Sequence, residues 1–296
     1  MAAMNASQIT VGNINFSNVK SLDNGGKMLY LNYGGGINPL YVTTPEVDIP
    51  FDPSYYPDND SSGKFAIKFS MKNMEDNKAM KDFHTWACNM DKLLIQKAGE
   101  NSQAWFKKPK LSEETLRELY TPMVKVSMDP DTGEPNGKYP DSFAFKVVKR
   151  DGKFKDFSIY DNKKTVFDVN GDTDSPTDIS KVLMKGALIK VVLKCNGVWI
   201  ANGKFGCTWR AEQIRVKLPE GGLSQFAIDS DSDDEDDGGS SAARPMIEDS
   251  SDEEEEVKQE ETPVEEDEDQ EVEEELEPAP APKKKVVRKV KKVNKD

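Results

Sequence analysis

Aromatic and basic side chains stand close together in three short stretches of the chain. The stretches are Trp105-Phe106-Lys107-Lys108-Pro109-Lys110, Phe143-Ala144-Phe145-Lys146 and Lys204-Phe205-Gly206-Cys207-Thr208-Trp209-Arg210. Aromatic rings can stack on nucleobases while lysine and arginine pair with phosphates, and proteins that bind single-stranded nucleic acid combine the two. The same pattern arises when a strand turns its rings to the core and its cations to solvent. Each stretch, taken alone, fits both interpretations.

Twelve residues are therefore candidate contacts to a nucleic acid. The rings expected to stack on bases are Trp199, Phe205 and Trp209, with a second set in Trp105 and Phe106. The cations expected to contact phosphates are Lys107, Lys108, Lys110, Lys194, Lys204, Arg210 and Arg215. Gly206 stands among these residues, and a glycine inside a strand predicts either a bulge or a close approach by another backbone.

Residues for catalysis or metal binding are sparse. The single histidine, His84, lies within a predicted amphipathic helix. His84 and Cys88 are four residues apart and offer two metal ligands, but no second pair has ligand spacing. The glycines at 34–36 lack the strand–turn–helix context of a nucleotide loop. We therefore expect no enzyme activity, no cofactor and no metal, and three free cysteine thiols in a reducing compartment.

The candidate residues must be held by regular elements, and three segments predict these most clearly. Apolar residues recur every three or four positions in 73–98, which indicates a helix that Gly99 is expected to end. Residues 111–119 predict a shorter helix with Ser112 as its N-cap. Residues 64–71 alternate apolar and polar side chains, which is typical of a half-buried strand.

Turn residues between alternating segments predict further strands. Residues 143–160 predict a hairpin around Asp151-Gly152. Residues 186–217 predict a meander with turns at Asn196-Gly197 and Asn202-Gly203. Many short antiparallel strands together with one or two helices indicate a small barrel.

Charge divides the chain into three parts. Residues 1–228 carry 30 basic and 27 acidic side chains, a net charge of +3, and contain all 25 aromatic residues. Residues 229–282 carry 2 basic and 26 acidic side chains, a net charge of −24, while 283–296 carry 8 and 1, a net charge of +7. Such an acidic segment without aromatic rings buries too little apolar surface to offset its ordering entropy. We expect one folded domain in 1–228, a disordered acidic tail in 229–282 and a basic segment in 283–296.

The acidic tail has three open interpretations. It competes with nucleic acid for a basic groove of the folded domain, it recruits basic partners, or it only keeps the protein soluble. Phosphorylation would deepen its charge, and four serines have an acidic residue three positions on, the pattern that acidophilic kinases accept. These serines are Ser230, Ser232, Ser250 and Ser251. The run at 283–296 is a candidate nuclear import signal or nucleic-acid arm.

One stretch of the sequence is similar to a known family. GALIKVVLKCNGVWIANGKFGCTWRAEQIRV at 186–216 resembles the last strands of the single-stranded DNA-binding proteins of short-tailed phages and, more closely, of their relatives in nucleocytoplasmic large DNA viruses. The shared pattern is a Gly-led apolar strand, an Asn-Gly turn, a short aromatic strand, a Gly-containing turn and a long strand ending in an apolar-basic run. YTPMVK at 120–125 and SMDPDTGEPNGKYPDSFAFKV at 127–147 look like the family's middle strands.

The resemblance implies an OB-fold barrel with helical insertions that binds single-stranded DNA without strong sequence preference. It also implies work in replication, recombination and repair, and an acidic tail that contacts replication proteins and competes with DNA. The phage members end in an acidic run with a terminal aromatic residue. This chain ends in a basic run instead, and no aromatic residue follows Phe226.

We therefore expect a mainly β fold, with an OB-fold-like barrel followed by a disordered tail, in a non-catalytic single-stranded DNA-binding protein of a large DNA virus. Its expected partners are single-stranded DNA, replication proteins at the acidic tail and further copies of the chain. A membrane is not among them, because no apolar run approaches the ~20 residues needed to cross one. The expected location is the host nucleus, a viral replication compartment or the virion. Two alternatives stay open: a histone-chaperone-like or scaffold protein that binds basic partners, and a transcription or mRNA-processing factor.

Overall fold

The computed structural model describes residues 3–23, 25–59 and 61–219, which form a mainly β domain with a few helices. This confirms the predicted fold class. The strands are β1 (Met4–Asn5), β2 (Ile14–Phe16), β3 (Lys20–Ser21), β4 (Lys27–Leu29), β5 (Leu31–Tyr33), β6 (Tyr41–Thr43), β7 (Val47–Asp48), β8 (Ser54–Pro57), β9 (Gly63–Ser70), β10 (Tyr120–Thr121), β11 (Val124–Lys125), β12 (Ser142–Lys149), β13 (Ser158–Tyr160), β14 (Leu188–Ala201) and β15 (Lys204–Lys217). The helices are η1 (Ala6–Gln8), η2 (Val11–Asn13), α1 (Lys78–Glu100), α2 (Ser102–Phe106), α3 (Glu113–Leu119) and α4 (Ile179–Val182).

All the strands except β2 and β5, which pair with each other, form one curled sheet. Its main path runs β1-β6-β14-β15-β12-β9-β8, with β4 and β7 added to β14 and with β10 and β13 added to β15. Lys72, just after β9, forms an ion pair with Asp48 of β7 at 3.1 Å. Because β7 pairs with β14 on the other side of the path, this contact shows that the sheet curls back on itself, as an OB-fold-like barrel requires.

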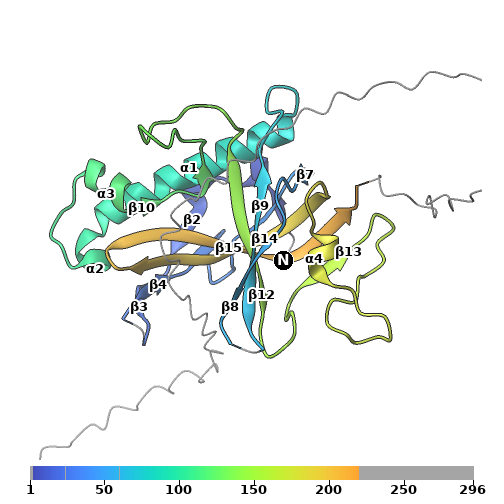
Figure 1. The fold of residues 1–296 in the computed structure, drawn as a ribbon. Coiled ribbons are helices and arrows are strands. Elements are labelled where there is room, and N and C mark those ends of the chain that lie inside the picture. Colours follow the sequence, from blue (N-terminus) through green and yellow to red (C-terminus); the bar gives the residue numbers. More distant parts are fainter. Residues whose placement is uncertain (1–2, 24, 60, 220–296) are drawn as a thin grey trace, which may run out of the picture. The chain divides into compact units, whose positions relative to one another are not determined.

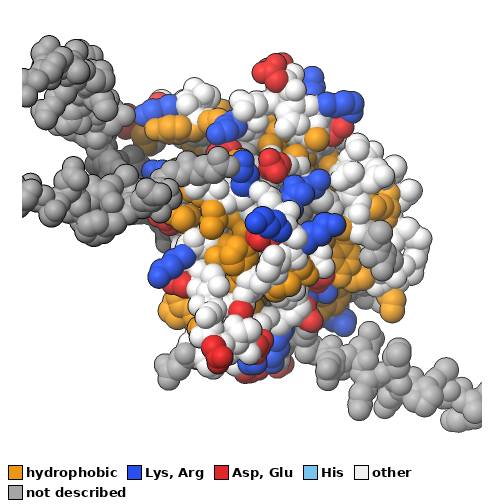
Figure 2. All heavy atoms as spheres, turned by 90° about the vertical axis from the view of Figure 1, so that its right-hand side faces the viewer, with side chains coloured by type: hydrophobic (Ala, Val, Ile, Leu, Met, Phe, Trp, Pro, Cys, Tyr) orange, Lys and Arg blue, Asp and Glu red, His pale blue; other side chains and the backbone are white. Residues whose placement is uncertain are grey.

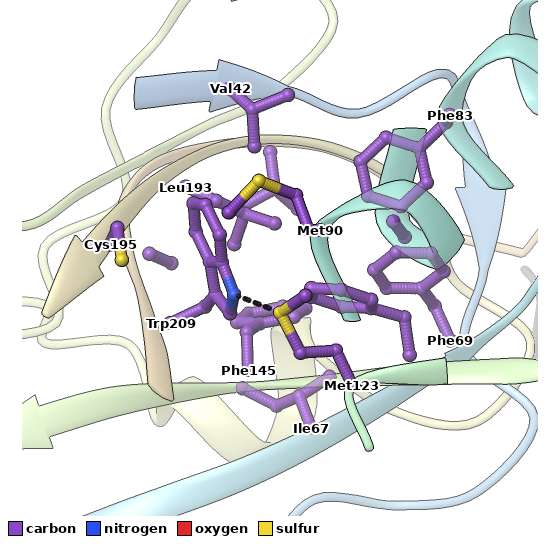
Figure 3. Packing of buried hydrophobic residues seen from close by; sticks show 14 of the residues in the cluster. Val42, Ile67, Phe69, Phe83, Met90, Met123, Phe145, Leu193, Cys195 and Trp209 are labelled. Carbon is purple, nitrogen blue, oxygen red and sulfur yellow. Dashed lines mark hydrogen bonds between the residues drawn. The ribbon is translucent and has the colours of Figure 1, made fainter. Parts of the chain in front are cut away.

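The core lies between the inner face of this sheet and α1 (Figure 1). The ring of Phe83 on α1 lies 5.8 Å from the ring of Phe69 on β9 and 5.5 Å from that of Phe143 on β12. Trp86, one turn further along α1, meets Trp209 of β15 edge to face at 5.4 Å. Figure 3 shows how the aromatic and sulfur-containing side chains fill this space.

The two predicted helices are present. α3 has the predicted cap, because the Ser112 hydroxyl accepts a hydrogen bond from the Thr115 amide at 3.2 Å. α1 begins later than expected, after Asn77, whose side chain accepts a hydrogen bond from the Met80 amide at 3.1 Å. Gly99 lies in the last turn of α1 and does not end it. A Cβ atom at Gly99 would lie 3.2 Å from a Leu116 methyl group, so this glycine makes room for α3.

The hairpin predicted for 143–160 is wrong in its second arm. Asp151 and Gly152 do form a tight turn, with φ of 50° and 79°. β12, however, pairs with β9 along its whole length, and β13 lies parallel to β15. The reason is that β9 pairs with β12 along its full length and places its rings on the same face as those of β12. A three-residue strand such as β13 is too short to do this.

The first turn of the predicted meander is also wrong. β14 runs unbroken through Asn196-Gly197, where the register with β15 shifts by a β-bulge. Gly197 has a φ of 125°, and a Cβ atom there would lie 2.5 Å from the Leu29 carbonyl oxygen on β4. Glycine thus allows β4 to approach, and only Asn202-Gly203 turns the chain. β14 and β15 therefore form one long hairpin, whose outer part, residues 198–207, we call the arm.

Several expectations concern segments outside the described residues. These are the acidic tail at 229–282, the basic segment at 283–296 and the phosphorylation candidates Ser230, Ser232, Ser250 and Ser251. Within the described part of the chain, no helix combines the length and the apolar character that crossing a bilayer takes.

Candidate nucleic-acid interface

Four side chains form a row across the curled sheet, which we call the basic row. The strand register places Tyr41 of β6 beside Lys194 of β14, Lys194 beside Arg210 of β15, and Arg210 beside Lys146 of β12. Directly paired residues on neighbouring strands project from the same face, with Cβ atoms about 5 Å apart. In all four cases the residues immediately before and after are buried in the core. The basic row therefore lies on the outer face of the sheet.

Trp199 lies on this same outer face, further along the hairpin. It pairs with Gly206, and the β15 register is regular from Gly206 to Arg210. Two positions four residues apart on a regular strand share one face and are separated by about 13 Å. Lys204, at the start of β15, is two residues from Gly206, so it lies on the same face of the strand, and it is exposed. One face of the sheet thus carries a partly exposed aromatic ring and a row of cations.

Gly206 holds the Trp199 ring against the sheet. A Cβ atom at Gly206 would lie 2.8 Å from Cζ2 and 3.1 Å from Nε1 of Trp199. The indole therefore lies over the Gly206 backbone, where any side chain would displace it. Neither of the two explanations that the sequence left open for Gly206 is observed: the register has no bulge there, and the group that approaches is the Trp199 side chain rather than another backbone.

This contact gives a first testable prediction. In a Gly206→Ala variant the added methyl group collides with the indole, and overpacking of this kind costs about 1–3 kcal/mol of unfolding free energy. Urea unfolding followed by circular dichroism measures the loss. Gly12→Ala is the matched control, because a Cβ atom there meets nothing within 4 Å. Equal stability of the two variants would show that the indole does not rest on Gly206.

Glu212 sets the electrostatics of the basic row. Its Oε1 atom lies 3.4 Å from Lys194 Nζ and 3.3 Å from Arg210 Nη2, and it accepts a hydrogen bond from the Tyr41 hydroxyl at 3.4 Å. Burial and the negative charge of Glu212 raise the pKa of the Tyr41 hydroxyl, which keeps it protonated as a donor. One carboxylate thus orients the row and neutralises part of its charge.

The outer face carries further cations that the sequence did not single out as a set. Lys190 pairs with Arg215 across β14 and β15, and Arg215 Nη2 lies 3.3 Å from Glu46 Oε2. Lys68 on β9 is exposed between two buried residues. Figure 2 shows one face of the molecule, on which lysine and arginine side chains lie among hydrophobic ones. Four of these residues were not among the contacts predicted from the sequence, because only the cross-strand register brings them together: Tyr41, Lys68, Lys146 and Lys190.

Three of the proposed stacking rings belong to the core instead. Phe205, Trp209 and Trp105 are almost completely buried, with exposed fractions of 0%, 2% and 4%. A ring without an exposed face cannot stack on a base unless it leaves its own packing, so we correct their assignment. Arg210 is also largely covered, with 10% of its side chain exposed. It therefore contributes to the positive charge of the surface but offers little area for a direct contact with a phosphate.

The second proposed set lies on the opposite side of the arm. Trp105 and Phe106 of α2 pack against Phe205 at ring distances of 6.0 and 5.4 Å. Lys27 Nζ fastens α2 to β4 by donating to the carbonyls of Ala104 and Trp105, both at 2.8 Å. The exposed Lys107 and Lys108 line a hollow of about 210 Å³ beside the hairpin turn. Lys110 is exposed in the loop that follows. This set does not join the basic row.

His84 is engaged in a local network on α1. Its Nε2 atom lies 2.8 Å from Asp141 Oδ2, and the Cys88 sulfur lies 3.8 Å from the same nitrogen. Burial and the nearby carboxylates raise the pKa of the Cys88 thiol, which disfavours the nucleophilic thiolate. Among the residues that the structure covers, no three metal-ligating side chains gather into a site.

No family model and no curated protein matches the chain. Solved structures do. Among them are phage single-stranded DNA-binding proteins.

One match is the single-stranded DNA-binding protein of bacteriophage Enc34 in complex with single-stranded DNA. It is 10% identical, has a TM-score of 0.36, and the match covers 71% of this chain and 99% of that chain. Another is gp2.5, a single-stranded DNA-binding protein encoded by bacteriophage T7. It is 12% identical, with a TM-score of 0.37 and coverage of 64% and 98%.

Proposed function

We propose that the chain binds single-stranded DNA along the outer face of β14 and β15, without catalysis and without strong sequence preference. One observation carries this proposal: Trp199 and the basic row lie on the same face of the sheet, and the distance between them along the strand is about 13 Å. Successive bases need stacking platforms, and the backbone between them needs cations. A duplex keeps its bases stacked inside and cannot use the Trp199 ring, so the surface favours single strands.

The proposal extends to the biological role. The chain serves viral DNA replication, recombination and repair, and it is located in the host nucleus, a viral replication compartment or the virion. Its acidic tail, which the structure does not cover, contacts replication proteins, and copies of the chain associate on long strands. The scaffold alternative rests on the same tail and on no feature of the described domain.

The experiment is a fluorescence-anisotropy titration of the full chain with a labelled mixed-sequence DNA oligonucleotide, its duplex and the matching RNA, each at two salt concentrations. Tight binding to the single strand, weaker binding to the duplex and a steep fall with salt are expected, because phosphate neutralisation releases counterions. Weaker binding to the RNA separates this proposal from the mRNA-processing alternative. No binding to any of the three would overturn the proposal in favour of a scaffold for basic partners.

A double variant tests the basic row. Replacing Lys194 and Lys146 by alanine removes two phosphate contacts, each of which contributes about 0.7 to the slope of log affinity against log salt for a single strand. The slope should fall by about 1.4 and the affinity at low salt by about tenfold.

The matched control removes the same charge elsewhere. Lys81 and Lys92 are exposed on α1, which packs against the inner face of the sheet. The Lys81→Ala, Lys92→Ala protein should keep both slope and affinity. A loss of equal size in the two double variants would mean that net charge alone, and not the basic row, holds the strand.

A further inference from the structure

A hollow opens in the outer face next to the basic row. It has a volume of about 330 Å³ and is lined by Ala3, Asn38, Pro39, Tyr41, Val192, Glu212 and Gln213. That volume lies at the lower end of the range for small-molecule pockets, about 300–1,000 Å³, and suits one flat heterocycle rather than a larger ligand. The hollow lies beside the surface on which the proposed single strand would run.

The walls of the hollow are of two kinds. Pro39, Val192 and the half-buried ring of Tyr41 offer apolar and aromatic surface, which suits the face of a base. Glu212 and Gln213 offer polar groups, which suit its edge. Lys194 Nζ lies 6.0 Å from the centre of the Tyr41 ring, close enough to take the phosphate next to a base in the hollow.

Glu212 decides which base edge fits. An ionised carboxylate only accepts hydrogen bonds. Its Oε1 atom is the one that meets Lys194, Arg210 and Tyr41. Within the described ranges, the hydrogen bonds of Glu212 all go to Oε1, which leaves Oε2 to accept a hydrogen bond from a ligand.

We infer that this hollow binds one unpaired nucleobase that carries an exocyclic amino group, with Glu212 accepting a hydrogen bond from that group. Cytosine and adenine present such a donor, whereas thymine and uracil present a carbonyl oxygen at the equivalent position, which repels the carboxylate. The inference rests on the proposed function and adds to it a modest base preference.

The test compares oligo-dC, oligo-dU and oligo-dT of equal length, titrated against the full chain. Cytosine and uracil are pyrimidines of the same size, so the pair isolates the amino group, and thymine adds only the methyl group. We expect oligo-dC to bind about fivefold to tenfold more tightly than oligo-dU and oligo-dT. Equal binding of the three would overturn the inference and leave the proposed function standing, whereas no binding to any of them would overturn both.

A pair of variants assigns the preference to Glu212. In Glu212→Gln the carboxamide both donates and accepts, so it can bond to either pyrimidine, and the preference for oligo-dC should disappear. Glu46→Gln is the matched control, because it removes the same charge from the partner of Arg215, outside the lining of the hollow. The inference fails if Glu212→Gln keeps the preference, or if Glu46→Gln loses it equally.

Discussion

Replacing Trp209 by alanine is expected to lower the free energy of unfolding by about 3–5 kcal/mol, the usual cost of removing a buried aromatic side chain. Trp209 is 2% exposed, its ring meets Trp86 and Phe143, and its Nε1–H donates to the Met123 sulfur at 3.0 Å (Figure 3). Alanine leaves a cavity where α1 meets the sheet. Since the free energy of unfolding of such domains is about 5–15 kcal/mol, the variant should lose a large part of its stability.

Urea unfolding of the purified protein, followed by far-UV circular dichroism, measures this loss. Phe205→Ala should behave similarly, because its ring is fully buried against Trp105, Phe106 and Tyr120. Both residues were first expected to stack on bases. A Trp209→Ala protein that unfolds within about 1 kcal/mol of the parent and binds DNA poorly would restore that role and contradict the core assignment.

Local sequence patterns predicted a helix, strand or turn correctly where that element forms independently of its neighbours in the fold. The alternation in 64–71 became β9 with its phenylalanines inward, and Ser112 caps α3. Asn202-Gly203 forms the expected turn of the long hairpin. In each case the side chains nearby in sequence supply the whole physical reason, namely burial of one face, a satisfied amide or a positive φ.

The pairing of strands could not be predicted in the same way. Asp151-Gly152 forms the expected turn, but β12 pairs with β9 and β13 pairs with β15. Which strands pair depends on the length and the apolar faces of strands that lie far apart in the sequence. Gly197 looked like a turn because its neighbour is asparagine. Its actual role depends on Leu29 of β4, about 170 residues earlier in the chain.

The same limit explains the mixed result for the candidate site. Alternation shows that Phe205 and Gly206 face opposite ways, but it does not show which face is buried. The answer comes from α2, whose Trp105 and Phe106 cover the Phe205 side of the arm. Trp199 is left on the open side, and the basic row forms only when β6, β14, β15 and β12 are aligned.

Replacing Trp199 by alanine is expected to weaken binding of a short single-stranded oligonucleotide by about 5- to 150-fold, since one base–aromatic stack is worth about 1–3 kcal/mol. The fold should survive, because Trp199 is partly exposed and belongs neither to the buried core nor to the side chains packed against it. Trp199→Phe keeps a ring and should retain most of the affinity. Phe51→Ala is the control for a lost exposed ring, because Phe51 is 66% exposed and lies near the start of β14, at the far end from the arm.

Intrinsic tryptophan fluorescence tests the same stacking contact without relying on a measured affinity. The protein has four tryptophans, and Trp86, Trp105 and Trp209 are buried while Trp199 is partly exposed. A base stacked on an indole quenches its emission, so saturating single-stranded DNA should quench the parent protein through Trp199. The Trp199→Phe protein should bind with almost no quenching. If quenching persists in that variant, the strand reaches a tryptophan that is buried in the free protein, and the outer face of the arm is not where the bases stack.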